Sequence, residues 1–438
     1  INNYCYPENP EAGINLFLEK LVQETEKEHE DILEQADETD AMFGELYSWY
    51  LRNPEYRSRV QKLVQSAFAG KPEDIISQSV AKALYGEVSP YSATRLERFA
   101  ACAFAHFLQY GMKLTERVEY EFKPMDMGNV MHEALESFAE EVRKRGMKWT
   151  ELTEQERNEI ADRCLDNIVA DYGNTVLKSS ARNEYMIERT RRILRRTVWA
   201  LQKQLEQGEF QPEGFEVTFG GGRIDRVDIM EDQNKVYVKV IDYKTGNTSF
   251  DLVYLYHGLQ LQLMIYLDGA LRVEQKKYPD KEIIPAGVFY YNIKDPMIQE
   301  KIDADVEAVS AGLMKELKMN GLAQADPELV YRMDSSLGSI PVAFNKDGSF
   351  RKNSSVADRT QFAVLGRYVR TKIEKIRSSI LEGDAEVSPY ELGKKNACTY
   401  CPYMTVCGFD RRLSGYEFRR LKNFSDEELW KAFDREAE

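Results

Sequence analysis

The chain has 438 residues, 43% hydrophobic and 30% charged, an ordinary balance for a globular protein of two or three domains. Its net charge of −14 argues against a protein that coats nucleic acid over its whole surface, although a local basic groove is compatible with it. No apolar run is long enough to cross a bilayer and no signal peptide opens the chain, so we expect a cytoplasmic protein without a membrane partner.

The first half of the chain has the heavy charge and the periodicity of helices, over residues 11–84 and roughly 152–207. Between them, "SPYSATRLERFAACAFAHFLQYG" predicts a helix with Ser92 or Thr94 as its N-cap and Gly111 as its end. A further helix is predicted around "GNVMHEALESFAEEVRKRG". Four of its residues share one face: His132, Leu135, Ala139 and Val142.

One helical segment, "RTRRILRRTVWALQKQ", is strongly basic and also carries Trp199 and an apolar side. Its arginines are Arg189, Arg191, Arg192, Arg195 and Arg196. Such a face is either a solvated helix surface or a contact for phosphate groups. For the second interpretation, the predicted DNA-binding residues are Arg191, Arg192, Arg195 and Arg196.

The hydrophobic period then changes. "FEVTFGGGRIDRVDIM" and "KVYVKVIDYK" predict successive strands separated by the polar turn "EDQN". "GLQLQLMIYLDGALRV" is helical again, "AGVFYYNI" is a further strand, and the tail from about residue 355 is helical up to a cysteine-rich end. This order predicts an α/β protein with a mixed core inside helical additions.

The strand in "VKVIDYKTG" ends in an acid and a lysine, Asp242 and Lys244, which point to the same face because they lie two residues apart. Asp225, which follows three glycines in the preceding strand, can meet Asp242 across the strand pair. Two such carboxylates suit Mg²⁺ or Mn²⁺, and a neighbouring lysine can stabilise developing negative charge or hold an attacking water. The pattern therefore indicates phosphodiester hydrolysis; the alternative is a surface ion pair.

Two further features accompany this pattern. Gln262 and Tyr266, four residues apart, share a face of the following helix. His132 lies on the inward face of an earlier helix, where an imidazole is either a metal ligand or a satisfied core histidine.

Four motifs in this order, "GNVMHEAL", "GGRIDRVD", "VIDYKTG" and "QLMIY", resemble the PD-(D/E)XK nuclease domain of the RecB and AddB type. The resemblance implies a restriction-endonuclease-like core, a mixed central sheet flanked by helices, and a metal-dependent DNA exonuclease. Its implied magnesium ligands are His132, Asp225, Asp242 and the carbonyl of Tyr243. Its implied catalytic residues are Asp225, Asp242, Lys244, Gln262 and Tyr266, with support from Glu216 in "FEVTFG".

Three of the six cysteines form a C-x2-C-x5-C cluster that lacks one ligand for a four-cysteine site: Cys398, Cys401 and Cys407. In a cytosolic chain such a set favours metal over disulfides, and four thiolates suit either zinc or iron and sulfur. The set resembles the AddB iron–sulfur site, which implies Cys102 as the fourth ligand of a [4Fe–4S] cluster, although Ala103 stands where the family usually has Pro. Cys5 and Cys164 are expected to be buried or free thiols.

The resemblance covers residues 89–415 and is to the AddB component of the AddAB helicase–nuclease. It implies a preceding helical segment at 1–88 and a helical tail at 416–438. It also implies an AddA partner, resection of DNA double-strand ends and cleavage of the strand ending 5′. The chain begins at Ile1 and has no G-x-x-x-x-G-K-[ST] phosphate loop, so we expect a C-terminal fragment without ATPase activity.

Three other interpretations stay open. The first is a Cas4-like single-strand exonuclease, which also combines a RecB-type core with four cysteines. The second is a noncatalytic DNA-end-binding scaffold with a structural cluster, against which the intact Asp225, Asp242 and Lys244 argue. The third is a zinc-stapled interaction module, which predicts a colourless protein without metal-dependent cleavage.

Overall fold

The computed structural model describes residues 38–67, 75–86, 92–115, 124–171, 180–220, 222–298, 305–412 and 415–437. The chain divides into two compact units. Unit 1 comprises Ile1–Ile76, Cys102–Ala105 and Asp384–Arg420, and unit 2 comprises Ser77–Ala101, His106–Gly383 and Leu421–Glu438. Cys5 and the helical pattern predicted before residue 38 lie outside the described residues. The predicted domain boundaries after residues 88 and 415 stay a prediction, because compactness alone does not test them.

In the described part of unit 2, the strands form a six-stranded sheet in the order β1-β2-β3-β4-β5-β6. Their bounds are Gln211–Phe219 (β1), Gly222–Asp232 (β2), Lys235–Lys244 (β3), Glu282–Asn292 (β4), Asn320–Gln324 (β5) and Val356–Ala357 (β6). β1, β2 and β3 are antiparallel neighbours, β3 runs parallel to β4, β4 antiparallel to β5, and β5 parallel to β6. The predicted mixed sheet is confirmed, and the segment "FEVTFGGGRIDRVDIM" proves to be two strands that meet at its glycines.

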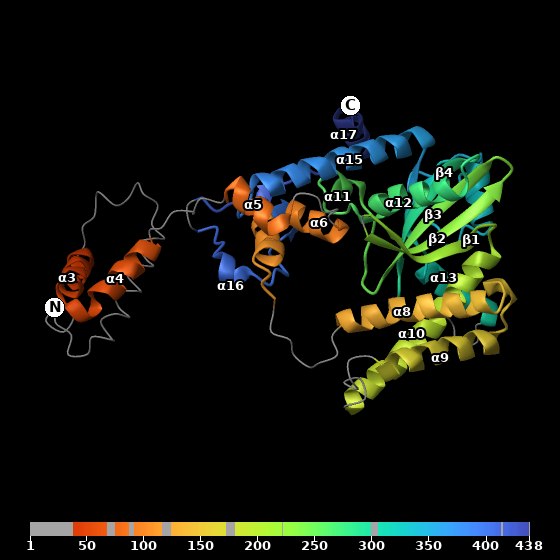
Figure 1. Ribbon diagram of the computed structural model, residues 1–438, viewed down its shortest axis with the longest axis horizontal. Helices are drawn as coiled ribbons and strands as arrows, with labels where there is room; N and C mark the ends of the chain where they lie inside the picture. Colours follow the sequence, from red (N-terminus) through yellow and green to blue (C-terminus); the bar gives the residue numbers. More distant parts are fainter. Residues whose placement is uncertain are drawn as a thin grey trace. The chain divides into compact units, whose positions relative to one another are not determined.

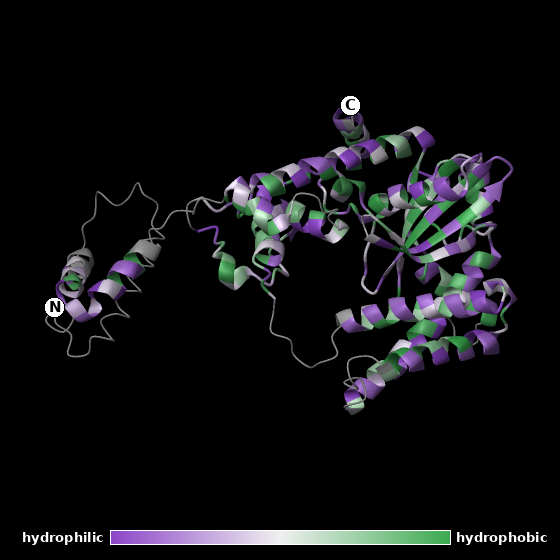
Figure 2. Ribbon diagram, in the orientation of Figure 1, coloured by the Kyte–Doolittle hydropathy of each residue, from purple (hydrophilic) through white to green (hydrophobic). Residues whose placement is uncertain are grey.

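The central strands of this sheet are covered on both faces. β2, β3 and β4 are buried along most of their length, and Val236, Val238 and Val240 of β3 have no exposed surface. Continuous apolar strands of this kind are typical of a sheet with helices on both sides, and Figure 2 shows them as hydrophobic ribbon. α12 (Gln262–Lys277) packs on β3 and β4 and in turn against α15 (Arg359–Glu382), while α8, α9 and α10 form a layer on the other side (Figure 1).

The remaining helices of unit 2 complete these layers. They are α5 (Gln78–Tyr85), α8 (Pro124–Lys144), η2 (Trp149–Glu151), α9 (Glu154–Asp171), α10 (Ala181–Glu206), α11 (Leu252–Tyr256), α13 (Val306–Glu316), α14 (Pro327–Met333) and α17 (Asp426–Ala437). Among the helices of the described ranges, none combines the length and the apolar character that crossing a bilayer requires.

The helix predicted to begin near Ser92 is interrupted at Cys102. It consists of α6 (Ala93–Ala101), α7 (Ala103–His106) and the π-helical turn η1 (Phe107–Gly111), which ends at the predicted Gly111. Ser92 is its cap, because Ser92 Oγ accepts a hydrogen bond from Arg95 N at 3.4 Å. The break matters because Cys102–Ala105 belong to unit 1, whereas the residues on either side belong to unit 2.

The described part of unit 1 holds two helices near the start of the chain and a small cysteine-rich subdomain. The helices are α3 (Glu38–Arg52) and α4 (Pro54–Ala67). The subdomain comprises the three-stranded sheet of β7 (Tyr390–Leu392), β8 (Lys395–Asn396) and β9 (Arg419–Arg420), with the short helix α16 (Met404–Cys407).

Candidate active site

Three carboxylates lie at facing positions of neighbouring strands in unit 2. On β1 and β2, Phe215 pairs with Arg226 and Val217 with Ile224, so Glu216 faces Asp225. On β2 and β3, Arg226 pairs with Ile241, and the next step of the same register brings Asp225 opposite Asp242. We call Glu216, Asp225 and Asp242 the carboxylate row. The strand register therefore brings Asp225 and Asp242 together, as the sequence pattern predicted.

The backbone of the row is ordered by local contacts. Tyr243 N donates a hydrogen bond of 2.7 Å to Asp225 Oδ2, which fixes that carboxylate against the end of β3. Glu216 has a φ of +49° inside a strand, a conformation that is uncommon for a residue with a side chain. Its carboxylate is nearly buried and forms an ion pair with Arg223. A strained residue held in place by its surroundings is typical of a functional site.

His132 of α8 joins the row. Its Nδ1 lies 3.4 Å from Asp225 Oδ2 and 3.8 Å from Glu216 Oε1. One ligand atom each from His132, Glu216 and Asp225 lies within 4.8 Å of the other two. Burial lowers the pKa of His132, but hydrogen bonds and negative charge from the two carboxylates raise it to about 10. His132 is therefore a partner of two acids, and the alternative of an ordinary core histidine does not describe its surroundings.

Asp242 and Lys244 form the next layer of the site. Asp242 is buried, and its burial together with the negative charge of Asp225 raises its pKa to about 7 against the opposing effect of Lys244 and His132. Lys244 Nζ lies 2.6 Å from Asp242 Oδ2, although the approach is off the direction of a good hydrogen bond. The exposed surface ion pair that the sequence left open as an alternative does not describe this pair, because the carboxylate is 1% exposed.

The start of α12 supplies the other side of this layer. Lys244 Nζ donates a hydrogen bond of 2.7 Å to Gln262 Oε1, and Gln262 Nε2 donates one of 2.9 Å to Tyr266 OH. The predicted spacing of four residues therefore places both side chains at the site. Tyr290 of β4, which pairs with Asp242 in the strand register, lies with its ring 5.4 Å from Lys244 Nζ.

One carboxylate near the site was not anticipated. Oε1 of Glu97, on α6, accepts hydrogen bonds from the backbone N of Leu261 at 2.7 Å and of Gln262 at 2.9 Å. Burial raises the pKa of Glu97 to about 7, although these two donors lower it. The sequence offered one weak signal, an acidic residue directly after the buried Leu96 in an amphipathic helix.

The four cysteines of the predicted cluster line one small cavity in unit 1, with apolar neighbours that include Phe104, Val387 and Phe409. They are Cys102, Cys398, Cys401 and Cys407. Burial raises the pKa of the Cys102 thiol, while backbone N–H groups of Ala105, Ser388 and Phe104 lower it by donating to the sulfur.

The loop around the other three cysteines is held by hydrogen bonds. Asn396 Oδ1 accepts from Cys398 N at 2.9 Å, and Cys407 Sγ accepts from Phe409 N at 3.5 Å. Burial and the three neighbouring thiols raise the pKa of Cys398 to about 12, so the four sulfurs lie close enough to repel one another as thiolates. Such a set suits a bound metal, which takes up that charge. Cys164, in contrast, is buried in α9 of unit 2.

The predicted DNA-binding arginines lie on α10 and line a groove of about 700 Å³ with α9 and α13. Three of them are paired with acids. Arg191 lies 2.8 Å from Asp166, Arg192 lies 2.5 Å from Asp295, and Arg195 Nε donates a 2.8 Å hydrogen bond to Asp162. Among the described residues Arg196 forms no ion pair with an acid, and its guanidinium lies 5.3 Å from the ring centre of Trp199. The DNA-binding role stays a prediction, and most of this positive charge is already compensated.

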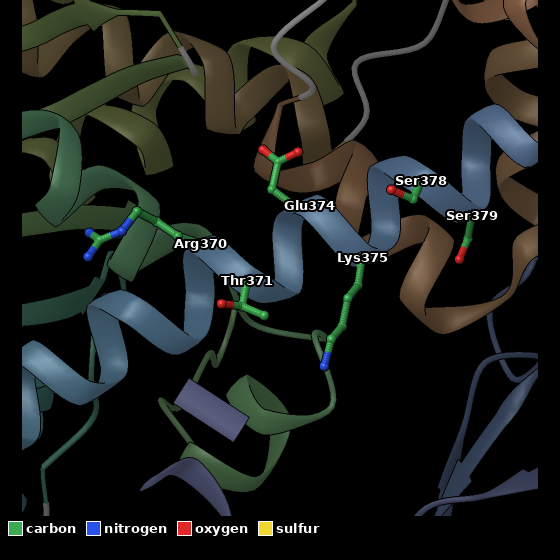
Figure 3. A pocket seen from close by; sticks show the side chains of 6 residues that line it. All are labelled: Arg370, Thr371, Glu374, Lys375, Ser378 and Ser379. Atoms are coloured by element: carbon green, nitrogen blue, oxygen red, sulfur yellow. The ribbon is translucent and has the colours of Figure 1, made fainter. Parts of the chain in front are cut away.

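A further hollow, of about 760 Å³, lies along α15. Figure 3 shows that Arg370, Glu374 and Lys375 leave the helix in different directions and do not converge on one point. This hollow therefore offers no set of groups that could act together on a ligand.

Residues 90–408 match the PD-(D/E)XK nuclease superfamily. The match covers most of the chain and includes both the sheet with its carboxylate row and the four cysteines. The chain therefore belongs to this superfamily, and the predicted fold class is confirmed.

Among curated proteins, the chain is similar to three whose names describe the second, or B-type, component of an ATP-dependent helicase/deoxyribonuclease. They come from Lachnoclostridium phytofermentans (41% identity over 92% of this chain), Thermoanaerobacter sp. strain X514 (33% over 92%) and Clostridium acetobutylicum (33% over 91%). The chain covers 36%, 37% and 36% of these relatives, little more than a third of their length. The predicted resemblance to the B-type component of a helicase–nuclease is confirmed by these similarities.

Proposed function

We propose that the chain is the nuclease part of the B-type component of a helicase–nuclease and hydrolyses phosphodiester bonds of DNA with Mg²⁺ or Mn²⁺. The observation that carries this proposal is the carboxylate row, which meets His132 on one side and Lys244 on the other. Membership of a nuclease superfamily and the names of the relatives support the same class of reaction.

The donor set fits a hard divalent cation. His132, Glu216 and Asp225 would hold it, with Asp242 and the carbonyl of Tyr243 as the further predicted ligands. The raised pKa of Asp242, caused by burial and by the neighbouring Asp225, supports this assignment because a cation relieves the repulsion between the two acids. When bound, such a cation supplies Lewis acidity and lowers the pKa of water.

The residues around Lys244 stabilise charge and fix orientation. Lys244 carries a positive charge that stabilises the negative charge developing on phosphate in the transition state. Asp242 and Gln262 contact its ammonium group from two directions, and Tyr266 fixes Gln262 in turn. This chain of contacts holds the ammonium group in one place before the substrate arrives, so little reorganisation accompanies the reaction.

The proposed function is tested by incubating end-labelled single-stranded DNA with the purified chain and Mg²⁺. We expect cleavage by the wild type, and its loss with a chelator or in Asp242→Asn. Asp232→Asn is the matched control, because Asp232 ends β2 in an ion pair with Arg332 away from the row. An inactive wild type would contradict the proposed activity, and equal cleavage by both variants would contradict the assignment of the site.

We further propose that the groove beside α10 contacts the DNA strand through Arg196 and Trp199. A cation beside an aromatic ring is typical of single-strand binding, where bases stack and phosphates pair. Arg191, Arg192 and Arg195 contribute less in this proposal because acids compensate their charge.

Arg196→Ala is therefore expected to weaken binding of single-stranded DNA several-fold and to lower the slope of log Kd against log salt by about 1. Arg191→Ala is the matched control, since Arg191 lies 2.8 Å from Asp166 and should change binding little. Fluorescence anisotropy at several salt concentrations measures both. Equal weakening in the two variants would contradict a specific role for Arg196.

For the four cysteines we propose a [4Fe–4S] cluster. The backbone N–H groups that point at Cys102 support it, because hydrogen bonds to sulfur are a feature by which proteins tune such clusters. The spacing supports it as well. A tetrahedral zinc ion with Zn–S bonds of about 2.3 Å holds its sulfurs about 3.8 Å apart. Within the described residues, no three of these sulfurs lie within 4.8 Å of one another.

For the whole protein, of which this chain spans little more than a third, we propose a cytoplasmic heterodimer with an AddA-type helicase–nuclease partner. That complex would resect DNA double-strand ends, and this nuclease would cut the strand ending 5′, with direction set by the threading of DNA through the complex. The Cas4-like alternative predicts the same chemistry. The scaffold alternative predicts DNA binding without cleavage, so the cleavage experiment separates it from this proposal.

A further inference from the structure

Glu97 supplies a cap that α12 does not have locally. The first backbone N–H groups of a helix lack partners within the helix, and a side chain just before the helix usually satisfies them. α12 begins after Leu261, which has no side-chain acceptor. Instead, one carboxylate oxygen of Glu97, 164 residues earlier in the chain, accepts from both Leu261 N and Gln262 N.

The residue that Glu97 caps is the residue that holds the catalytic lysine. Gln262 is bonded through its backbone N to Glu97 and through its side-chain Oε1 to Lys244 Nζ. Its side-chain Nε2 donates to Tyr266 OH, so no polar group of the Gln262 side chain is left to adjust independently. A shift of the first turn of α12 is therefore transmitted to the ammonium group of Lys244 through a single side chain.

Glu97 is also anchored on its own side. It lies in α6 between residues that pack inward, with Leu96 1% and Ala100 7% exposed, and α6 contacts both α12 and α15. Because α6 is fixed by this packing, the Glu97 carboxylate gives the start of α12 a fixed reference point. A loss of the carboxylate frees the first turn without removing any group that touches DNA or metal.

Resting on the nuclease function proposed above, we propose that Glu97 is a positioning residue of the reaction: it fixes the first turn of α12 and, through Gln262, sets the position of Lys244. It acts through hydrogen bonds to two backbone N–H groups, a role that an amide oxygen in the same place can fill. The negative charge is not required for it.

The test compares Glu97→Ala, Glu97→Gln and Leu96→Ala in the full chain. Glu97→Ala should lower kcat for single-stranded DNA on the order of 10- to 100-fold with KM unchanged, because a small displacement of a catalytic group has effects of this size. Glu97→Gln should stay within about 3-fold of wild type, since its amide oxygen accepts the same bonds. Leu96→Ala, which removes packing from the same helix, should lower Tm and leave kcat unchanged at temperatures where it is folded.

A double variant shows whether the effect runs through Gln262. In the Gln262→Ala background, Glu97→Ala should cost little more, because the link to Lys244 is already cut. Full additivity of the two losses would overturn the proposed route, as would a Glu97→Ala variant with the kcat of the wild type. A Leu96→Ala variant with the same loss of kcat would also overturn it, since packing alone would then explain the effect.

Hydrogen exchange provides a readout that does not depend on cleavage. Glu97→Ala should speed amide exchange in the peptide that covers residues 261–266, whereas Glu97→Gln and Leu96→Ala should leave that peptide close to wild type. If the wild type fails to cleave DNA but exchange changes as expected, the nuclease proposal falls and the capping role of Glu97 stands. If the wild type cleaves and exchange at 261–266 is the same in all variants, the positioning role falls alone.

Discussion

Replacing Lys244 by alanine is expected to lower the rate of DNA cleavage on the order of 10³-fold and to leave the fold nearly unchanged. The Lys244 ammonium group lies 2.6 Å from Asp242 Oδ2 and 2.7 Å from Gln262 Oε1, while its side chain remains 27% exposed. The side chain thus contributes little core packing. Because its charge acts on the transition state more than on bound DNA, kcat should fall while the affinity for DNA is retained.

The measurement is the initial rate of cleavage of end-labelled single-stranded DNA at saturating Mg²⁺, with circular dichroism to check the fold. Lys281→Ala is the matched control, since Lys281 lies just before β4, at the other end of that strand, in a surface ion pair of 2.7 Å with Glu231. It should cleave like the wild type. Retained cleavage in Lys244→Ala would remove Lys244 from the site and leave the carboxylate row without its proposed cationic partner.

Replacing Cys401 by alanine is the second change with a large expected effect. It should empty the four-cysteine site of metal and lower Tm by more than about 5 °C, because the free energy of metal binding is part of the free energy of folding in such sites. The four cysteines come from two segments of unit 1 that are distant in sequence. A metal held between them links these segments, so its loss releases both.

Metal and sulfide analysis, visible absorption and thermal unfolding measure this effect. Cys164→Ala is the matched control, because Cys164 is a buried cysteine in unit 2 that belongs to no cluster among the described residues. It should keep the full metal content and lower Tm only by the cost of a small cavity. Unchanged metal content in Cys401→Ala would contradict the site, and stoichiometric zinc in the wild type would contradict the iron–sulfur assignment.

The parts of the site that sequence could predict are those set by short-range periodicity. The two-residue period of a strand put Asp242 and Lys244 on one face, and adjacent strands brought Asp225 opposite Asp242. The helical period brought Gln262 and Tyr266 into contact. His132 is different, because periodicity left it open between a ligand and a core residue, and only the resemblance to a nuclease family indicated its role.

The parts that sequence could not predict depend on contacts between distant segments. Nothing near Glu97 indicates that its acceptor oxygen meets the start of α12, because the donors are backbone groups 164 and 165 residues away. The strained φ of Glu216 likewise depends on the register of β1 and β2. For α10, the pattern showed the arginines, but their acids lie on other elements of the fold, so the compensation of their charge was invisible.

The excursion of Cys102–Ala105 into unit 1 sets an order of assembly for the chain. The six-stranded sheet is complete in sequence at Ala357, whereas Cys102 meets Cys398, Cys401 and Cys407 only after about 300 further residues. At 5–20 residues per second, synthesis of that stretch takes roughly 15–60 s. During this interval Cys102 is a lone thiol on a nascent chain, open to oxidation or to a wrong metal. The cofactor therefore enters last, and its arrival marks a chain whose translation has passed residue 407.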